Sequence, residues 1–196
     1  KTIAQELQNL VGDQYCIYNH GRAYFYSKQE NNLFIQHIEN NHSIEYAFFL
    51  TLPLMQFYNS IQNKGRWFNY ADNNILEIES CKNSIAALDG PTTIDELFTK
   101  RTNLRHALCN EEKIKCFSFL QPFGGVHGIN IEKLMNKERA KELLKKYTVL
   151  KKNKNYVVDL GYVLNNDKTL SYVDGVHYSP SSNKKIAKEF KLFLIN

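Results

Sequence analysis

The sequence predicts an α/β domain built around a parallel β-sheet. Segments with the apolar period of a helix alternate along the chain with short apolar segments typical of strands. One of these short segments, residues 44–52, is apolar almost throughout, as expected of a strand buried on both faces. The predicted strands are separated by helices of ten or more residues, and crossover connections of this kind join parallel strands.

The first quarter of the chain predicts two helices and two strands. Apolar residues at helical spacing predict a helix over residues 1–10. Residues 15–18 have the composition of a short strand. Ser27 and Glu30 have the spacing of a capping box, which predicts the start of a second helix. The buried strand described above follows this helix.

The rest of the chain continues the alternation after a less regular segment. Residues 56–91 show no clear period, and we interpret residues 60–92 as an insertion. Because no internal repeat or linker is visible, we expect a single domain over residues 1–196. The later predicted elements are a helix over residues 93–108, a strand over 115–120, a helix over 131–146, a strand over 156–160 and a helix over 182–194.

The helix predicted over residues 93–108 carries apolar residues at helical spacing. Side chains that recur every three or four residues share one face of a helix. A face rich in apolar residues is expected to point toward the core. The predicted face consists of Ile94, Leu97, Phe98, Arg101, Leu104 and Leu108.

The composition excludes several classes of protein. With 43% apolar residues the chain can bury a core, and no apolar stretch is long enough to cross a bilayer. We expect no secretory signal in residues 1–10, which are polar and amphipathic. The net charge of +5 comes mainly from lysine, whereas nucleic-acid readers rely on arginine. Residues 133–154 are a solvated helix face or, as the weaker alternative, a polyanion-binding surface, and we expect no nucleic-acid partner.

The cysteines show no metal or redox motif. Cys16, Cys81, Cys109 and Cys116 lack the Cys-x-x-Cys spacing. Cys16 and Cys116 lie inside predicted strands, so we expect buried thiols rather than disulfides. Free thiols slightly favour a reducing compartment and leave the periplasm open.

The candidate catalytic residues lie in loops that follow strands. In open parallel sheets such residues collect at the carboxyl ends of the strands. Asp174 precedes His177 by three residues in a turn that leads into the last helix. A carboxylate in this position can accept one imidazole N–H and leave the other nitrogen free to act as a base. The same spacing also occurs in surface turns without a function.

Three segments together resemble the SGNH (GDSL-type) hydrolase superfamily. Residues 174–183, Asp-Gly-Val-His-Tyr-Ser-Pro-Ser-Ser-Asn, resemble its C-terminal block. Residues 117–122, Phe-Ser-Phe-Leu-Gln-Pro, resemble a strand and Leu-Gln-Pro loop common in its bacterial members. Asn19-His20-Gly21 is similar to its second block. The resemblance implies a three-layer α/β/α fold of the flavodoxin-like kind.

The resemblance implies an esterase that removes an acyl group from a carbohydrate or lipid. It implies His177 as the general base, Asp174 as its orienting carboxylate and the Gly21 N–H as an oxyanion-hole donor. Such acyl transfer needs no metal and no cofactor. His20 and His127 border the expected site and are either substrate contacts or surface residues. The resemblance leaves the substrate, the oligomeric state and the choice between bacterial cytoplasm and periplasm open.

The sequence departs from the superfamily in two blocks. The Gly-Asp-Ser block, which carries the nucleophile after the first strand, has no counterpart in residues 1–196. The third block normally carries an Asn, which residues 51–56 lack. We expect the serine and the central first strand to lie ahead of Lys1, because two strands with unpaired facing edges are unstable. The alternative is a catalytically impaired SGNH fold that acts as a ligand-binding module.

Overall fold

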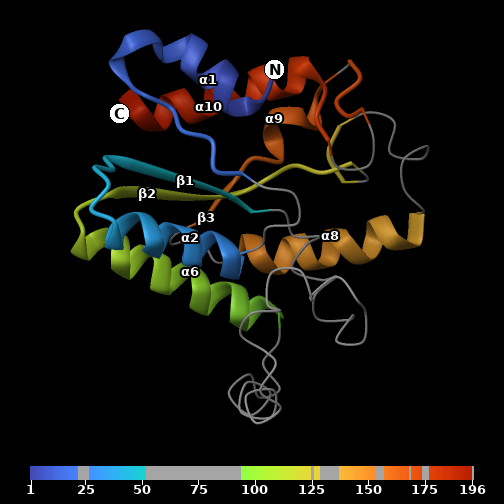
Figure 1. Ribbon diagram of the computed structural model, residues 1–196. Helices are drawn as coiled ribbons and strands as arrows, with labels where there is room; N and C mark the ends of the chain where they lie inside the picture. The colour runs from blue at the N-terminus through green and yellow to red at the C-terminus, as the bar shows by residue number, and fades with distance from the viewer. Residues whose placement is uncertain are drawn as a thin grey trace, which may run out of the picture.

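The computed structural model describes residues 1–21, 27–51, 94–124, 126–128, 137–152, 157–167, 169–173 and 177–195. These residues form a parallel β-sheet with helices on both of its faces (Figure 1). The insertion expected at residues 60–92 lies outside the described residues. The helices are α1 (Ile3–Val11), α2 (Ser27–Glu39), α6 (Ile94–Glu111), α8 (Lys137–Lys151), α9 (Tyr162–Asn165) and α10 (Pro180–Ile195), with a short 3-10 helix at Gly12–Gln14.

The described sheet has the strand order β1-β2-β3, where β1 is Tyr46–Thr51, β2 is Lys115–Leu120 and β3 is Val157–Asp159. Both neighbouring pairs are parallel, and β1 and β2 are paired along their whole length. The chain passes from β1 to β2 through α6 and from β2 to β3 through α8, as parallel neighbours require. The predicted α/β class with a parallel sheet is therefore confirmed.

One face of the sheet is covered by α1 and α10, the first and last helices (Figure 1). Phe119 of β2 is fully buried there, and its ring centroid lies 4.6 Å from that of Phe190 in α10. Leu7 of α1 belongs to the same cluster. The start of α10 is bonded to the first residue, since the Asn183 side chain donates a hydrogen bond to the Lys1 carbonyl at 2.9 Å. This face is therefore closed by residues from opposite ends of the sequence.

The other face is covered by α2, α6 and α8 (Figure 1). Phe34 of α2 packs on Phe49 of β1, with ring centroids 5.3 Å apart. Phe98 of α6 and Tyr147 of α8 belong to a second cluster on this side. Phe48, next to Phe49, contacts the opposite cluster, because neighbouring side chains of a strand point to opposite faces. Burial on both faces explains why β1 is apolar throughout most of its length.

The buried face of α6 differs in part from the predicted one. Phe98 is buried as expected, but Leu104 is 52% exposed and Arg105 is buried instead. Thr102, His106 and Cys109 are also buried, and these positions keep helical spacing. Apolar spacing along α6 does not reveal Arg105. This side chain is buried because it has a carboxylate partner, Glu30, inside the domain.

The strand predicted over residues 15–18 is wrong, because the described structure has no strand there. Instead, this extended segment bonds to the side chain of Gln8 in α1. The Ile17 N–H donates to Gln8 Oε1 at 2.8 Å, and Gln8 Nε2 donates to the Tyr15 carbonyl at 2.8 Å. One glutamine thus satisfies backbone groups that a neighbouring strand would otherwise bond.

The cysteine prediction is also wrong for the described residues. Cys109 in the last turn of α6 and Cys116 in β2 form a disulfide, with 6.1 Å between their Cα atoms. The chain reverses direction between α6 and β2, which brings two cysteines seven positions apart together. Cys16 is a free and exposed thiol. The Cys16 thiol is exposed because residues 15–18 do not form a strand inside the sheet.

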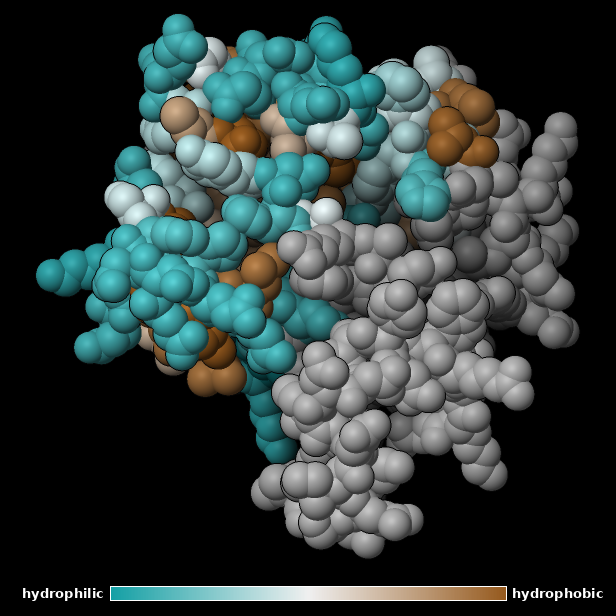
Figure 2. Space-filling model, viewed as in Figure 1, coloured by the Kyte–Doolittle hydropathy of each residue, from teal (hydrophilic) through white to brown (hydrophobic). Residues whose placement is uncertain are grey.

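The visible surface of the described helices is mainly hydrophilic (Figure 2). Exposed hydrophobic side chains are spread over several elements, as is normal for a folded domain. Within the described part of the chain, no helix is both long enough and apolar enough to span a membrane.

Candidate active site

His177 lies between α9 and α10, where two extended segments run antiparallel to each other. We call these segments, residues 171–173 and 177–179, the first and second arm of the hairpin. Tyr172 and Tyr178 form an antiparallel bridge in this hairpin. The Val173 N–H donates to the His177 carbonyl at 2.9 Å, and the Ser179 N–H donates to the Ser171 carbonyl at 3.0 Å. His177 itself is exposed. Asp174, its predicted carboxylate partner, lies outside the described residues.

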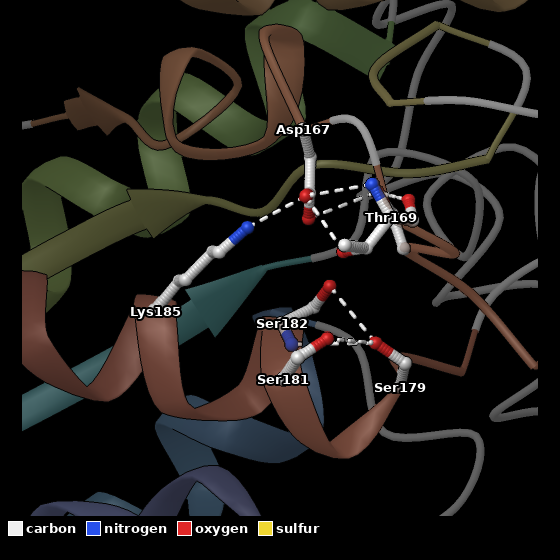
Figure 3. Close-up of polar contacts among 7 residues, drawn as sticks. Asp167, Thr169, Ser179, Ser181, Ser182 and Lys185 are labelled. Atoms are coloured by element: carbon white, nitrogen blue, oxygen red, sulfur yellow. Dashed lines mark hydrogen bonds and ion pairs between the residues drawn. The ribbon is translucent and has the colours of Figure 1, made fainter.

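A buried carboxylate anchors the first arm of this hairpin (Figure 3). The Asp167 side chain is 2% exposed and lies 2.6 Å from Lys185 Nζ of α10. It also accepts hydrogen bonds from the Thr169 hydroxyl at 2.7 Å and the Ser171 hydroxyl at 3.3 Å. Burial raises the pKa of Asp167, but the hydrogen bonds from Lys185 and Thr169 outweigh it and lower the pKa to about 2. The carboxylate stays charged at neutral pH and ties the hairpin to α10.

Ser179 anchors the second arm, because it caps the N-terminus of α10. The Ser182 N–H donates to Ser179 Oγ at 3.3 Å, and the Ser181 hydroxyl lies 2.9 Å from the same oxygen (Figure 3). Pro180 occupies the first position of the helix, where its missing N–H leaves no bond unmade. Ser-Pro therefore starts the helix two residues after His177.

Tyr178 connects the hairpin to the loop that follows β2. Its hydroxyl donates to Gln121 Oε1 at 2.9 Å and also contacts the Pro122 carbonyl oxygen. Gln121 directly follows the last residue of β2. The structure thus places Tyr178, and with it the neighbouring His177, next to the carboxyl end of a parallel strand, where active sites of open α/β sheets lie.

The residues of the second block are in a different environment. The Gly21 N–H donates to Asn19 Oδ1 at 3.1 Å. The ring of the exposed His20 lies 4.3 Å from that of His37, in the last turn of α2. The chain turns from that end of α2 into β1, so His37 lies toward the amino ends of the strands. His20 is therefore packed beside α2 and not in the contacts around Tyr178, and its role stays a prediction.

His127 is buried rather than on the surface. It is 6% exposed, its ring centroid lies 4.7 Å from that of Tyr147, and its Nδ1 accepts the Phe123 N–H at 3.4 Å. Burial lowers the pKa of His127 to about 4, so the ring is neutral at pH 7. A side chain at Gly161 would collide with His127 Nε2. His127 is packed tightly at the carboxyl ends of β2 and β3, and a substrate contact stays a prediction.

Asp159, at the end of β3 and beside His127, interacts with three donors. Lys151 Nζ lies 2.7 Å from one oxygen of Asp159, and the Gly161 N–H donates to the other at 2.7 Å. The Tyr147 hydroxyl donates to the same carboxylate. Burial opposes ionisation, but the hydrogen bonds from Lys151 and Tyr147 lower the pKa of Asp159 overall. Lys151, from the lysine-rich segment, is exposed and forms an ion pair with the half-buried Asp159.

A buried ion pair that the sequence pattern does not reveal joins α2, α6 and the sheet. The Arg105 side chain is 1% exposed and lies 2.9 Å from Glu30 Oε2, which also accepts the Thr51 hydroxyl at 3.4 Å. Arg105 Nε donates to Asn31 Oδ1 at 2.8 Å. Burial lowers the pKa of Arg105, and Glu30 opposes this shift. The signal in the sequence is an arginine at helical spacing from Phe98.

These contacts hold the start of α2 and the end of β1 in place. Glu30 belongs to the first turn of α2, and Thr51 is the last residue of β1. Arg105 and Glu30 therefore tie the first turn of α2 to the last residue of β1.

A metal centre is not supported by the part of the chain that the structure describes. It contains no group of three or more His, Cys, Asp or Glu side chains that could hold an ion. Two histidines do lie close together, with 2.6 Å between His37 Nδ1 and His42 Nδ1. At this distance one nitrogen must donate a proton to the other, so the pair is explained by a hydrogen bond.

Comparisons with known proteins bear on the fold. No protein-family model matches the chain, and no curated protein matches its sequence. Among solved structures, the chain is similar to the crystal structure of an acetyl xylan esterase, with a TM-score of 0.61 and 13% sequence identity. The match covers 99% of this chain and 91% of that chain. At this identity the similarity establishes a shared α/β fold over nearly the whole length of both proteins.

Proposed function

We propose that the protein is an esterase with a three-layer, flavodoxin-like SGNH fold and a Ser-His-Asp mechanism. His177 is the general base, and Asp174 orients it. The Gly21 N–H is an oxyanion-hole donor. The nucleophile is a serine that the family resemblance puts in a Gly-Asp-Ser block ahead of Lys1. The substrate is an ester of a carbohydrate or lipid.

The placement of His177 is the observation that carries the proposal. The hairpin is anchored on both arms, and it presents an exposed imidazole beside the loop that follows β2. The similarity to a solved esterase supports the fold on which such a site is built. Among the described residues, β1 has a hydrogen-bonded neighbour only at β2. Its other edge is where the resemblance puts the strand that precedes the serine.

The proposed reaction follows from these roles. The serine hydroxyl attacks the ester carbonyl while His177 accepts its proton, and the Gly21 N–H stabilises the oxyanion. His177 then gives the proton to the leaving alcohol, which leaves an acyl-enzyme. Water attacks the acyl-enzyme with the help of the same base and releases the acid.

A ligand-binding module without turnover is the second candidate, and one observation favours it. The Gly21 N–H is already bonded to Asn19, and the preceding His20 packs against His37 in the last turn of α2, so this segment must move before Gly21 can donate to an oxyanion beside His177. Residues 51–56 also lack the second side-chain donor of the superfamily. Loss of one such donor costs roughly 10²–10³ in rate.

Hydrolysis of p-nitrophenyl acetate and of an acetylated xylo-oligosaccharide by the complete gene product tests the proposal. The name of the solved neighbour makes acetylated xylan the first carbohydrate ester to try. His177→Ala should lower kcat by roughly 10²–10⁴-fold, because it removes the general base. His42→Ala, which removes an exposed histidine after α2, is the control and should keep wild-type activity. Equal activity of His177→Ala and wild type would refute the assignment, and binding of the oligosaccharide without turnover by wild type would favour the module.

A further inference from the structure

We propose that Tyr178 is a positioning residue for His177, which it holds beside the end of β2 through its hydroxyl group. The inference rests on the proposed function for the role of His177, and it adds a residue to which the sequence motif gives no role.

The hairpin has an inner and an outer face. Neighbouring side chains of an extended strand point in opposite directions. Tyr172 and Tyr178 are opposite each other in the bridge, with ring centroids 5.5 Å apart, and Tyr172 is only 1% exposed. Val173 is 61% exposed, and His177, which bonds to it, is exposed as well. The inward direction of the tyrosine rings therefore sets the outward direction of the imidazole.

The Tyr178 hydroxyl fixes this face against the sheet. It contacts two oxygens, Gln121 Oε1 and the Pro122 carbonyl, which belong to consecutive residues at the end of β2. Gln121 is itself held, because its N–H donates to the Thr51 carbonyl at 3.2 Å. The contacts run from β1 through Gln121 to Tyr178, which is the residue next to His177. A shift of His177 relative to the strand ends must break it.

Tyr172 provides a matched comparison on the same hairpin. It is more deeply buried than Tyr178, yet its hydroxyl has no hydrogen-bond partner among the residues that the structure describes. Removal of the Tyr178 hydroxyl breaks the contacts with the strand end, whereas removal of the Tyr172 hydroxyl breaks no hydrogen bond within this part of the chain. The variants Tyr178→Phe and Tyr172→Phe differ from wild type by one oxygen each, so the rings and their packing stay in place.

Steady-state kinetics of the complete protein tests the effect on catalysis. Tyr178→Phe should lower kcat roughly 10- to 100-fold and leave KM unchanged, because a misplaced base weakens only the transition state. Tyr172→Phe should keep the wild-type kcat. Gln121→Leu removes one of the two acceptors and should lower kcat less than Tyr178→Phe does. The double variant should be no worse than Tyr178→Phe alone, since both changes break the same contact.

Hydrogen exchange separates failure of this inference from failure of the proposed function. The amides of Val173 and Ser179 form the hairpin hydrogen bonds and should exchange faster in Tyr178→Phe than in Tyr172→Phe or wild type. If the wild type hydrolyses no ester but this difference is seen, the proposed function fails and the contact between hairpin and strand stands. Wild-type kcat or wild-type exchange in Tyr178→Phe would overturn the inference.

Discussion

His127 shows how a single buried side chain links packing to pH. Its ring lies against Tyr147 and Phe123, and a side chain at position 161 in place of Gly161 would collide with it. Burial lowers the pKa of His127 from its ordinary value of 6.5 to about 4. Above pH 6.5 the ring is neutral in both the folded and the unfolded state, so it adds no dependence on pH. Between pH 6.5 and 4 the unfolded state binds a proton that the folded state does not bind, so the free energy of unfolding falls as the pH falls.

Replacement of His127 by glutamine should therefore flatten the acid side of the stability profile. The pKa difference corresponds to roughly 3 kcal/mol, which the wild type loses by about pH 4 and the variant does not lose. Glutamine keeps an acceptor for the Phe123 N–H. Urea unfolding at several pH values between 7.5 and 4 measures the difference between the two proteins. Parallel curves for wild type and His127→Gln would contradict the predicted neutral ring.

Among the elements, the junction of α6 and β2 is joined by a covalent bond. Cys109 is 1% exposed and packs in the core cluster that contains Phe34 and Phe49, where it is bonded to Cys116 of β2. A disulfide across seven positions restricts the unfolded chain and contributes about 2–3 kcal/mol in the loop-entropy treatment. The bond also persists best in an oxidising compartment, which weakens the argument from cysteine content for a reducing one.

Reduction of this disulfide should lower the melting temperature by roughly 5–10 °C. The measurement is thermal unfolding with and without a phosphine reductant. The double variant Cys109→Ala/Cys116→Ala is the matched control, and its melting temperature should not respond to the reductant. A reductant effect of equal size in wild type and double variant would show that the stability comes from elsewhere.

The elements that could be predicted from the sequence are those whose information is local. β1 and β2 follow from short apolar runs, and α1 and α10 follow from apolar spacing, because each packs on one large core. Residues 15–18 were mispredicted because a strand needs a partner, and local composition cannot supply one. Arg105 was missed because its partner Glu30 is 75 positions away.

In the candidate site, too, the residues with a local sequence signal could be predicted and those held by long-range contacts could not. The turn with His177 was predicted because Asp-x-x-His is a local motif. Its anchor at Tyr178 could not be predicted, since Gln121 is 57 positions away in the sequence and reaches Tyr178 only in the folded chain. Long-range contacts of this kind are set by the packing of the whole sheet.

At the scale of the whole molecule, the first and last helices close one face of the sheet together. The Tyr15 hydroxyl donates to the Leu194 carbonyl at 3.1 Å, and Lys191 Nζ donates to the Leu10 carbonyl at 2.8 Å. These bonds join residues that are about 180 positions apart. Because such contacts form only when most of the chain is already ordered, this face ties the stability of the whole domain to α10.

Phe190→Ala should therefore destabilise the entire domain rather than fray one helix. The Phe190 side chain is buried against Phe48 and Phe119, and its removal should cost about 3–5 kcal/mol. The melting temperature should fall by roughly 10 °C in a single transition followed by circular dichroism. Leu192→Ala, on the same helix but with a 47% exposed side chain, is the control and should change the melting temperature little. A separate early transition confined to helical signal in Phe190→Ala would instead mean that α10 unfolds independently of the sheet.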